Sequence, residues 1–173
     1  MRLSRMKSMK MADILRHTFV TSDHHFGSWQ LPEPFKVFSQ EQEKELIEKW
    51  NLVVGKDDII YYNGDFADCN VQQLCDYAKQ LNGHIVLIKG NHDTLPIDVY
   101  KAIFKDVVDS YVIDDLGLLV HHCPGPSYGK REVFGHLHRT DFFKKTANNQ
   151  FCSCVQFHDG FPVSLEQVLL SFK

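Results

Sequence analysis

The sequence lacks the features that mark membrane proteins, secretory precursors and small disulfide-rich proteins. No apolar run approaches the roughly 18–20 residues that a membrane-spanning helix needs. The basic start MRLSRMKSMKMADILRH has no apolar stretch of the kind found in secretory signals. The five Cys are odd in number and form no CxxC pair, which argues against a disulfide framework and a zinc ribbon. These absences favour the reducing environment of the cytoplasm.

A strong net charge is also missing. Nineteen Lys and Arg stand against 22 Asp and Glu, which gives a formal net charge of −3. This balance does not support a broad nucleic-acid-binding surface, so nucleic acid stays open only as a substrate. Internal repeats and low-complexity linkers are absent as well. A chain of 173 residues, 43% hydrophobic and 24% charged, is therefore expected to form one globular domain.

Methionine is confined to the start of the chain. All four Met occur at Met1, Met6, Met9 and Met11. Several in-frame start codons explain this pattern most simply, and a basic tail that docks on an anionic partner is the alternative. We expect residues 1–12 to be disordered, and residues 13–173 to form the single domain.

Short apolar runs alternate with amphipathic segments from residue 17 onward, which is typical of an α/β protein. Helices are expected between or after the strands, at residues 39–54, 70–81, 96–104 and 164–172. The helical segments between the early strands have the length of right-handed crossovers, so the sheet should be parallel at first and mixed later. We expect strands at residues 17–22, 58–64, 84–90, 107–113, 117–122, 132–138 and 151–157, with the fourth and fifth forming a hairpin.

Histidine is abundant, with ten in the chain, and Asp, Asn and His follow five of the expected strands. In open α/β folds, binding and catalytic residues collect at the carboxyl ends of strands. A single fragment of this kind is weak, because a lone His is usually a surface residue and GNHD could form an ordinary turn. Five such fragments together predict a divalent metal site with imidazole, carboxylate and amide ligands and no thiolate. The fragments are residues 23–25, 64–68, 90–93, 121–122 and 135–138.

The segments SDHHFG, GDFAD, GNHD, HHCP and GHLH, in this order, resemble the five signature blocks of the calcineurin-like metallophosphoesterases. The likeness is greatest to the small single-domain bacterial and phage members, and it extends from about residue 17 to the C-terminus. It implies a layered α/β/β/α sandwich of mixed sheets flanked by helices. It also implies hydrolysis of a phosphate ester by a two-metal mechanism with a bridging hydroxide as the nucleophile.

The resemblance implies two divalent ions, with Mn²⁺ as the first choice and Fe²⁺, Ni²⁺ or Zn²⁺ as alternatives. Two divalent ions contribute +4, two Asp ligands −2 and a hydroxide −1, so the residual charge of +1 would attract an anionic phosphate ester. The implied ligands are Asp23, His25 and His138 for the first ion, Asn91, His122 and His136 for the second, and Asp65 as the bridge between them.

Two further residues match the catalytic positions of the family. His92 matches the catalytic His beside the metal ions, where it would act as the general acid. Asp68 matches the carboxylate that would hold the His92 ring and keep it protonated. Between the adjacent His121 and His122, only one can face the metal ions, because neighbouring side chains point to opposite sides of a strand. The block His-x-Pro favours His122.

Substrate contacts are less well indicated. His24 points away from its ligand neighbours, so it would either reach substrate or pack in the core. Tyr128, Lys130 and Arg131 could contact a phosphate or stack on a base, and a solvated loop is the alternative. Ser28 stands where the family commonly has His or Asn.

A chain of this length leaves no room for a cap domain, so the cleft should be open. A phosphodiester is favoured, and diesters derived from nucleotides or nucleic acid are candidates. Phosphomonoesters, including phosphoproteins, are the alternative substrates. A catalytically silent scaffold, such as the retromer subunit of this fold, is the alternative class, and the retained His92 speaks against it. A membrane partner is not expected, and assembly of identical copies stays open.

Overall fold

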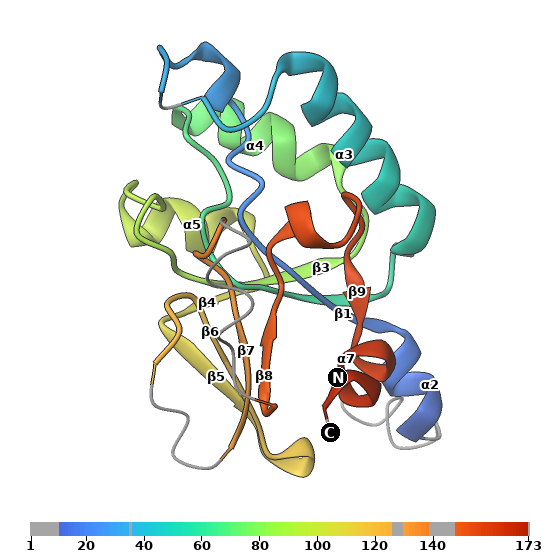
Figure 1. The fold of residues 1–173 in the computed structure, drawn as a ribbon. Coiled ribbons are helices and arrows are strands. Elements are labelled where there is room, and N and C mark those ends of the chain that lie inside the picture. Colours follow the sequence, from blue (N-terminus) through green and yellow to red (C-terminus); the bar gives the residue numbers. More distant parts are fainter. Residues whose placement is uncertain (1–10, 35, 126–129, 139–147, 173) are drawn as a thin grey trace.

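The computed structural model describes residues 11–34, 36–125, 130–138 and 148–172. Two β-sheets pack against each other, and helices flank them (Figure 1). This arrangement confirms the expected α/β sandwich of mixed sheets. Within the described part of the chain, no helix is both long enough and apolar enough to cross a membrane.

The first sheet has five strands in the order β4–β3–β2–β1–β9. Strands β1 to β4 are parallel, and β9 is antiparallel to β1. Because parallel strands end at the same edge, the loops after β1, β2 and β3 meet there. The strands are β1 (Thr18–Thr21), β2 (Ile59–Tyr62), β3 (His84–Ile88), β4 (Asp106–Val108) and β9 (Val163–Ser164).

The second sheet has four strands in the order β5–β6–β7–β8. β5 and β6 form an antiparallel hairpin, as expected, around the 3₁₀ turn η2 (Asp114–Leu116), and β6, β7 and β8 are parallel. The carboxyl ends of β6 and β7 thereby bring two more loops to the loops of the first sheet. The strands are β5 (Ser110–Ile113), β6 (Leu118–His121), β7 (Arg131–Phe134) and β8 (Gln150–Cys152).

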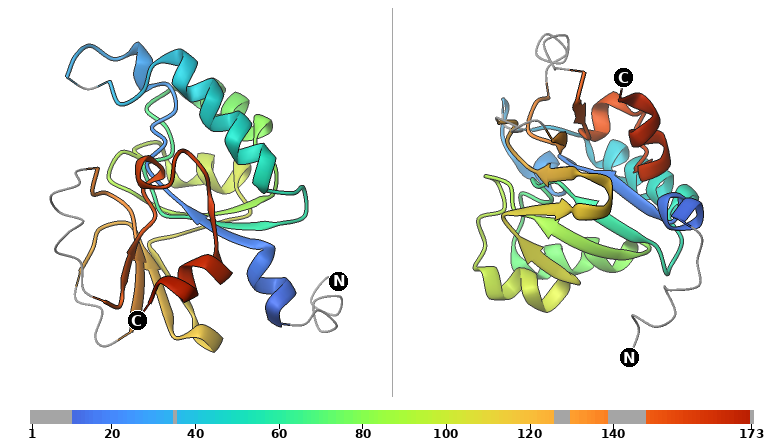
Figure 2. Two further views of the ribbon diagram at one scale, coloured as in Figure 1. Left: turned by 45° about the vertical axis from the view of Figure 1, so that its right-hand side comes forward. Right: turned by 90° about the horizontal axis from the view of Figure 1, so that it is seen from below.

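Three helices cover the outer face of the first sheet (Figures 1 and 2). They are α3 (Gln40–Val53), α4 (Val71–Gln80) and α5 (Ile97–Ile103). Near the other end of the sheets, α2 (Met11–Arg16) packs beside α7 (Leu165–Ser171), and Arg16 Nε lies 3.1 Å from Glu166 Oε1. Capping boxes at Ser39 and Ser164 fix where α3 and α7 begin.

The apolar residues form two main layers of core. One lies between the first sheet and its helices and contains Trp50, Tyr62 and Leu74. The other lies between the sheets and contains Val20 of β1 and Val120 of β6. Because burying one large apolar side chain contributes about 1.5–3 kcal/mol, these layers hold the strand ends in place.

Four sequence-based boundaries were wrong. Residues 107–113 do not form one strand, because the chain leaves the first sheet after β4 and enters the second at β5. The strands expected at 132–138 and 151–157 end at Phe134 and Cys152, and irregular backbone follows each. Met11 and Ala12 were expected in the disordered tail but are the first residues of α2. The errors at 132–138 and 151–157 fall where the backbone leaves the strand and carries polar side chains toward the expected ligands.

Candidate metal centre

The first set of expected ligands converges at the meeting edge of the sheets. One ligand atom each from Asp23, His25, Asp65 and His138 lies within 4.8 Å of the others. Nε2 of His25 is 3.2 Å from Nε2 of His138, and Nε2 of His138 is 3.3 Å from an Asp23 oxygen. Three of these residues are buried, and His138 is half-buried. The structure therefore brings together the ligands expected for the first ion.

The second set converges beside the first. Nε2 of His122 lies 2.9 Å from Oδ1 of Asn91, 3.2 Å from Nδ1 of His136 and 3.3 Å from Oδ2 of Asp65. The same Oδ2 is 3.6 Å from Nε2 of His25 in the first set. A single oxygen of Asp65 thus faces both sets, as a bridging ligand must.

The donor chemistry of these residues fits bound cations. Nδ1 of His25 donates to Asp68 and Nδ1 of His122 donates to the carbonyl of Asn63, both at 2.7 Å. In the neutral ring, the opposite Nε2 is then an acceptor with a free lone pair. Each of these nitrogens faces further acceptor oxygens. A cluster of inward-facing lone pairs is the arrangement that a divalent ion satisfies.

Backbone strain is concentrated at the ligands. Among the described residues, five other than glycine have positive φ, and four of them are expected ligands: Asp23 (62°), His25 (46°), Asp65 (57°) and His136 (70°). Such conformations cost of order 1–3 kcal/mol each and persist where the surrounding structure enforces them. The cost is consistent with loops that are shaped to aim side chains into a site.

Two glycines allow the loops to approach closely. A Cβ on Gly90 would collide with Oδ1 of Asp65, and a Cβ on Gly135 would lie 2.6 Å from Oδ2 of Asp23. In both cases the added carbon would lie closer to the carboxylate oxygen than any normal carbon–oxygen contact. Gly90 and Gly135 therefore make room for carboxylates, which explains their places in the third and fifth sequence blocks.

The carboxylates of the site are held ionised. Burial alone would raise the pKa of Asp65, but the hydrogen bond and charge of His122 outweigh it and lower this pKa to about 2. Burial likewise opposes the charge of Asp23, and the hydrogen bond and charge of His138 lower its pKa. The same pairs raise the pKa of His122 and of His138 above the ordinary value against the effect of burial. Asp23 and Asp65 therefore carry negative charge that protonated His122 and His138 offset, and a bound cation would take the place of those protons.

His92 and Asp68 lie where the resemblance places the catalytic pair. Nδ1 of His92 is 2.9 Å from Oδ1 of Asp68, and the His92 side chain is 48% exposed. The backbone N–H of His92 donates to Oδ1 of Asp65 at 2.9 Å, which leaves Oδ2 of Asp65 free to face both ligand sets. The imidazole thus borders the metal centre with its Nε2 unengaged by Asp68.

Of the three possible substrate contacts, His24 packs in the core, which is one of its two expected roles, Arg131 lies away from the ligand sets, and Tyr128 cannot be placed. His24 is fully buried against Phe26 and Trp50, its Nδ1 lies 2.7 Å from the Tyr62 hydroxyl, and burial lowers its pKa to about 3. Arg131 begins β7, at the opposite end of the strand from His136, and its guanidinium lies over the ring of Phe172 at 5.4 Å. Tyr128 is outside the described residues.

The adjacent histidines have different partners. His122 faces the ligands, whereas Nε2 of His121 pairs with the carboxylate of Glu132, which is fully buried. That carboxylate also accepts a hydrogen bond from the Gly125 N–H at 3.0 Å. Glu132 therefore fixes the chain on both sides of the His122 block. Sequence patterns do not indicate this role, because a Glu on a strand usually faces solvent.

A thiol lies closer to the centre than the sequence pattern indicated. Sγ of Cys123 and the ring nitrogens of His122 and His136 are all within 4.8 Å of one another. The expectation of a site without thiolate overlooked this neighbour, which lies close enough to join the second ligand set. Cys123 directly follows the expected ligand His122 in the sequence, and this position could have indicated that its thiol lies near the centre.

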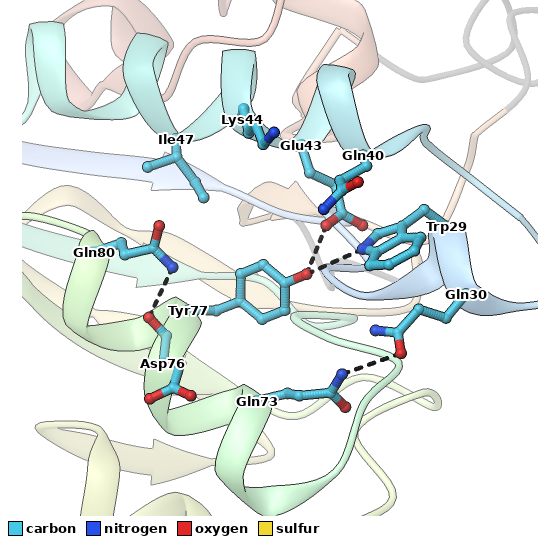
Figure 3. Close-up of a pocket in the computed structure, with 10 residues that line it drawn as sticks. All are labelled: Trp29, Gln30, Gln40, Glu43, Lys44, Ile47, Gln73, Asp76, Tyr77 and Gln80. Atoms are coloured by element: carbon cyan, nitrogen blue, oxygen red, sulfur yellow. Dashed lines mark hydrogen bonds between the residues drawn. The ribbon is translucent and has the colours of Figure 1, made fainter.

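A buried carboxylate on α3 anchors the first ligand loop from behind. Glu43 accepts a hydrogen bond from the Gly27 N–H at 2.8 Å. It also accepts one from the Tyr77 hydroxyl at 2.7 Å (Figure 3). Trp29 donates from Nε1 to the same hydroxyl at 3.4 Å. A cavity of about 280 Å³ lies over these groups between α3 and α4, and none of the expected ligands lines it. Glu43 thus ties the turn after His25 to the helical layer.

Comparison with known proteins agrees with this centre. The family model described as "Calcineurin-like phosphoesterase" matches residues 17–164, which is most of the chain. The chain belongs to this family. Members are metal-dependent phosphoesterases, and the buried Asp and His cluster of this chain is a candidate site for their divalent ions.

Two relatives have no described function of their own. The chain is 35% identical over 121 residues to the uncharacterized protein MJ1445 of Methanocaldococcus jannaschii, covering 62% of this chain and 68% of that protein. Its fold is similar to the crystal structure of the protein of unknown function AQ665 from Aquifex aeolicus. That match has a TM-score of 0.69 at 18% identity and covers 87% of this chain and 96% of the other. The second likeness concerns the fold alone.

Proposed function

We propose that this calcineurin-like phosphoesterase hydrolyses a phosphate ester, with a phosphodiester as the favoured substrate, and that it binds two divalent ions. The main support is that Oδ2 of Asp65 faces both ligand sets, 3.6 Å from Nε2 of His25 and 3.3 Å from Nε2 of His122. When bound, two divalent ions in such a site activate water and neutralise phosphoryl oxygens.

The ligand roles follow from the two sets. Asp23, His25 and His138 would hold the first ion, and Asn91, His122 and His136 the second, with Asp65 shared. Nitrogen and oxygen donors of this mixture suit Mn²⁺, Fe²⁺, Ni²⁺ and Zn²⁺, and we favour Mn²⁺. Cys123, which lies beside the second set, adds weight to the softer alternatives if its sulfur takes part.

His92 would supply the proton that the leaving oxygen needs. Its Nδ1 is engaged by Asp68, so a protonated ring presents Nε2–H at the border of the centre. Proton donation of this kind typically contributes about 10²–10⁴ in rate. Oδ1 of Asp65 is held by the His92 backbone, so one residue both orients the bridging carboxylate and borders the reacting group.

Chelation and a substrate panel test the proposal. Full-length protein stripped with EDTA should lose hydrolysis of an activated phosphodiester, and added Mn²⁺ should restore it. Activities on a phosphodiester, a phosphomonoester and a 2′,3′-cyclic nucleotide would then rank the substrate classes. Equal activity before and after exhaustive chelation would contradict metal dependence, and no hydrolysis of any substrate with any of the four metals would favour a silent scaffold.

A further inference from the structure

A short segment after β8 connects the two sheets directly behind the first ligand set. Cys154 forms a parallel bridge with Ser22 at the end of β1, and the Val155 N–H donates to the Ser22 carbonyl at 3.2 Å. Ser153 bonds to the Phe134 carbonyl at the end of β7. The segment continues into the 3₁₀ turn η3 (Val155–Phe157), which lies over the ligand edge of the sandwich (Figure 1).

Cys154 of this segment contacts a proposed ligand of the first ion. Sγ of Cys154 donates a hydrogen bond to Oδ2 of Asp23 at 2.9 Å, and Cys154 is fully buried. The His136 N–H contacts both oxygens of the same carboxylate at 3.0 Å. These contacts fix the rotation of the Asp23 carboxylate, because one donor approaches Oδ2 from the β8 side while the other lies between the two oxygens.

Two residues later, the segment contacts another ligand of the same ion. Nδ1 of His138 lies 3.0 Å from Oε1 of Gln156, an exposed residue of η3. A donation from Nδ1–H to this oxygen leaves the lone pair of His138 on Nε2, which faces His25 and Asp23. Gln156 therefore sets both the tautomer and the orientation of the His138 ring.

The second ligand set receives nothing from this segment among the described contacts. Nδ1 of His122 donates to the backbone carbonyl of Asn63, and Asn91 contacts Nε2 of His122. Nδ1 of His136 lies 3.2 Å from Nε2 of His122, which is in the same ligand set. The support of the two metal positions is thus asymmetric, since only the first relies on the side chains of residues 154 and 156.

We propose that Cys154 and Gln156 are positioning residues that hold Asp23 and His138 and thereby set the affinity of the first metal position selectively. The inference rests on the proposed function in one respect, namely that the two ligand sets bind ions. Hydrogen-bond partners of metal ligands typically contribute 10–100-fold to affinity. Removing the Gln156 acceptor should therefore weaken the first ion by about this factor and leave the second nearly unchanged.

The test is a calorimetric titration of EDTA-stripped full-length protein with Mn²⁺. Wild-type protein should show two binding events, and the variants His138→Ala and His136→Ala assign them to the first and second positions. Gln156→Ala should weaken the first event by about 10–100-fold. Gln156→Glu, which keeps an acceptor oxygen and adds a negative charge, should restore it. Gln80→Ala, an exposed glutamine on α4, is the matched control.

Cys154 is tested by the same titration. Cys154→Ala removes the donor to Asp23 and should weaken the first event, whereas Cys154→Ser keeps a donor and should recover much of it. Thermal melts of the metal-free proteins show whether each variant folds. Because Gln156 is exposed, its variants keep the test valid if Cys154→Ala does not fold.

Two outcomes would overturn the inference. An unchanged first event in Gln156→Ala, with two normal events in the wild type, would remove the positioning role while leaving the proposed function intact. An equal loss in both events would show that the segment supports the whole centre and not one position. Wild-type protein that binds no Mn²⁺ or other divalent ion would contradict the inference together with the proposed function.

Discussion

The carboxylate of Asp68 accepts a hydrogen bond from Nδ1 of His25 at 2.7 Å. Its other oxygen lies 2.9 Å from Nδ1 of His92, so one carboxylate connects a proposed metal ligand to the proposed general acid. The two imidazole rings meet edge to face, with centroids 4.8 Å apart. Burial would raise the pKa of Asp68, but the hydrogen bond and charge of His25, followed by those of His92, lower it. Asp68 therefore remains a charged acceptor for both rings.

Replacing Asp68 should consequently affect two properties together. In Asp68→Asn the amide can still accept from one ring, but it no longer supplies charge to both. We expect Mn²⁺ affinity at the first position to fall by about 10-fold. We also expect turnover of a poor leaving group to fall by about 10–100-fold, a smaller defect than loss of the acid itself. Calorimetry and rate measurements on the same preparation would check both, and a variant with altered turnover but unchanged metal affinity would contradict the shared role.

Replacing His92 should affect catalysis alone. His92→Asn should keep both ions, because the side chain is not a member of either ligand set. Turnover of an alkyl ester should fall by about 10²–10⁴, since its leaving oxygen needs a proton. The loss should shrink with a nitrophenyl ester, whose leaving group departs as an anion. Metal content and the two rates decide the matter, and an equal loss for both esters would point to phosphate positioning by His92 instead of proton donation.

The ligand blocks could be predicted from the sequence because each directly follows an apolar strand. Asp23, Asp65, Asn91, His122 and His136 all follow the ends of parallel strands, and the topology brings those ends together. Apolar periodicity also located α3 and α4 over the first sheet, and Pro96 indicated the start of α5. These patterns involve residues that are close in the sequence, so they can be recognised without knowledge of the tertiary fold.

Contacts between distant segments could not be predicted in this way. Gln156 meets His138 and Cys154 meets Asp23 only because irregular backbone at 153–157 replaces the expected strand. Arg131 is adjacent in sequence to the expected phosphate-binding loop but belongs to the far end of β7. His24 is preceded and followed by proposed ligands, yet the strained backbone of both neighbours turns its ring into the core. Sequence proximity is a poor guide where positive φ redirects successive side chains.

The adjacent histidines should separate stability from catalysis. His122→Ala should weaken the second ion and reduce turnover by orders of magnitude, because it removes a ligand that faces Asp65 and Asn91. His121→Ala should leave metal stoichiometry unchanged and cost about 1–3 kcal/mol of stability, since Glu132 loses a partner while buried. Urea unfolding and metal analysis of the two variants provide the comparison. Loss of an ion in His121→Ala would show that the wrong histidine has been assigned.

Gly90 should be intolerant of a side chain although its backbone is not strained. In Gly90→Ala the new Cβ would meet Oδ1 of Asp65, so the bridging carboxylate must shift. We expect weaker binding of both ions, because Asp65 is shared. Gly125→Ala is the matched control, since the nearest atom to its Cβ would be 4.0 Å away on His121. Calorimetric titration with Mn²⁺ compares them, and normal binding in Gly90→Ala would argue against a bridging role for Asp65.

His24 should govern acid stability and not substrate binding. Burial lowers its pKa from 6.5 to about 3, so the folded ring stays neutral where the unfolded chain takes up a proton. The folded protein therefore pays no penalty for His24 while the pH stays above the pKa of this residue in the unfolded chain. Below that pH the unfolded chain binds a proton that the folded chain does not, and the free energy of unfolding falls. Between about pH 7.5 and pH 5.5 the loss amounts to about 1.4 kcal/mol for this one group.

The variant His24→Phe isolates this effect. It should be less stable than the wild type near neutral pH by about 0.5–1.5 kcal/mol, because the Tyr62 hydroxyl loses its bond to Nδ1. Its stability should nevertheless fall less on acidification, since Phe cannot take up a proton. Urea unfolding of the EDTA-treated wild type and variant at both pH values gives the free energy of unfolding of each protein. Subtracting one from the other removes the contribution of the titratable groups that the two proteins share. With Mn²⁺ restored, KM for the phosphodiester should be unchanged near neutral pH. A raised KM in a stably folded His24→Phe would return His24 to the substrate-binding residues. A side chain that only packs in the core cannot change substrate affinity while the fold and both ions remain intact.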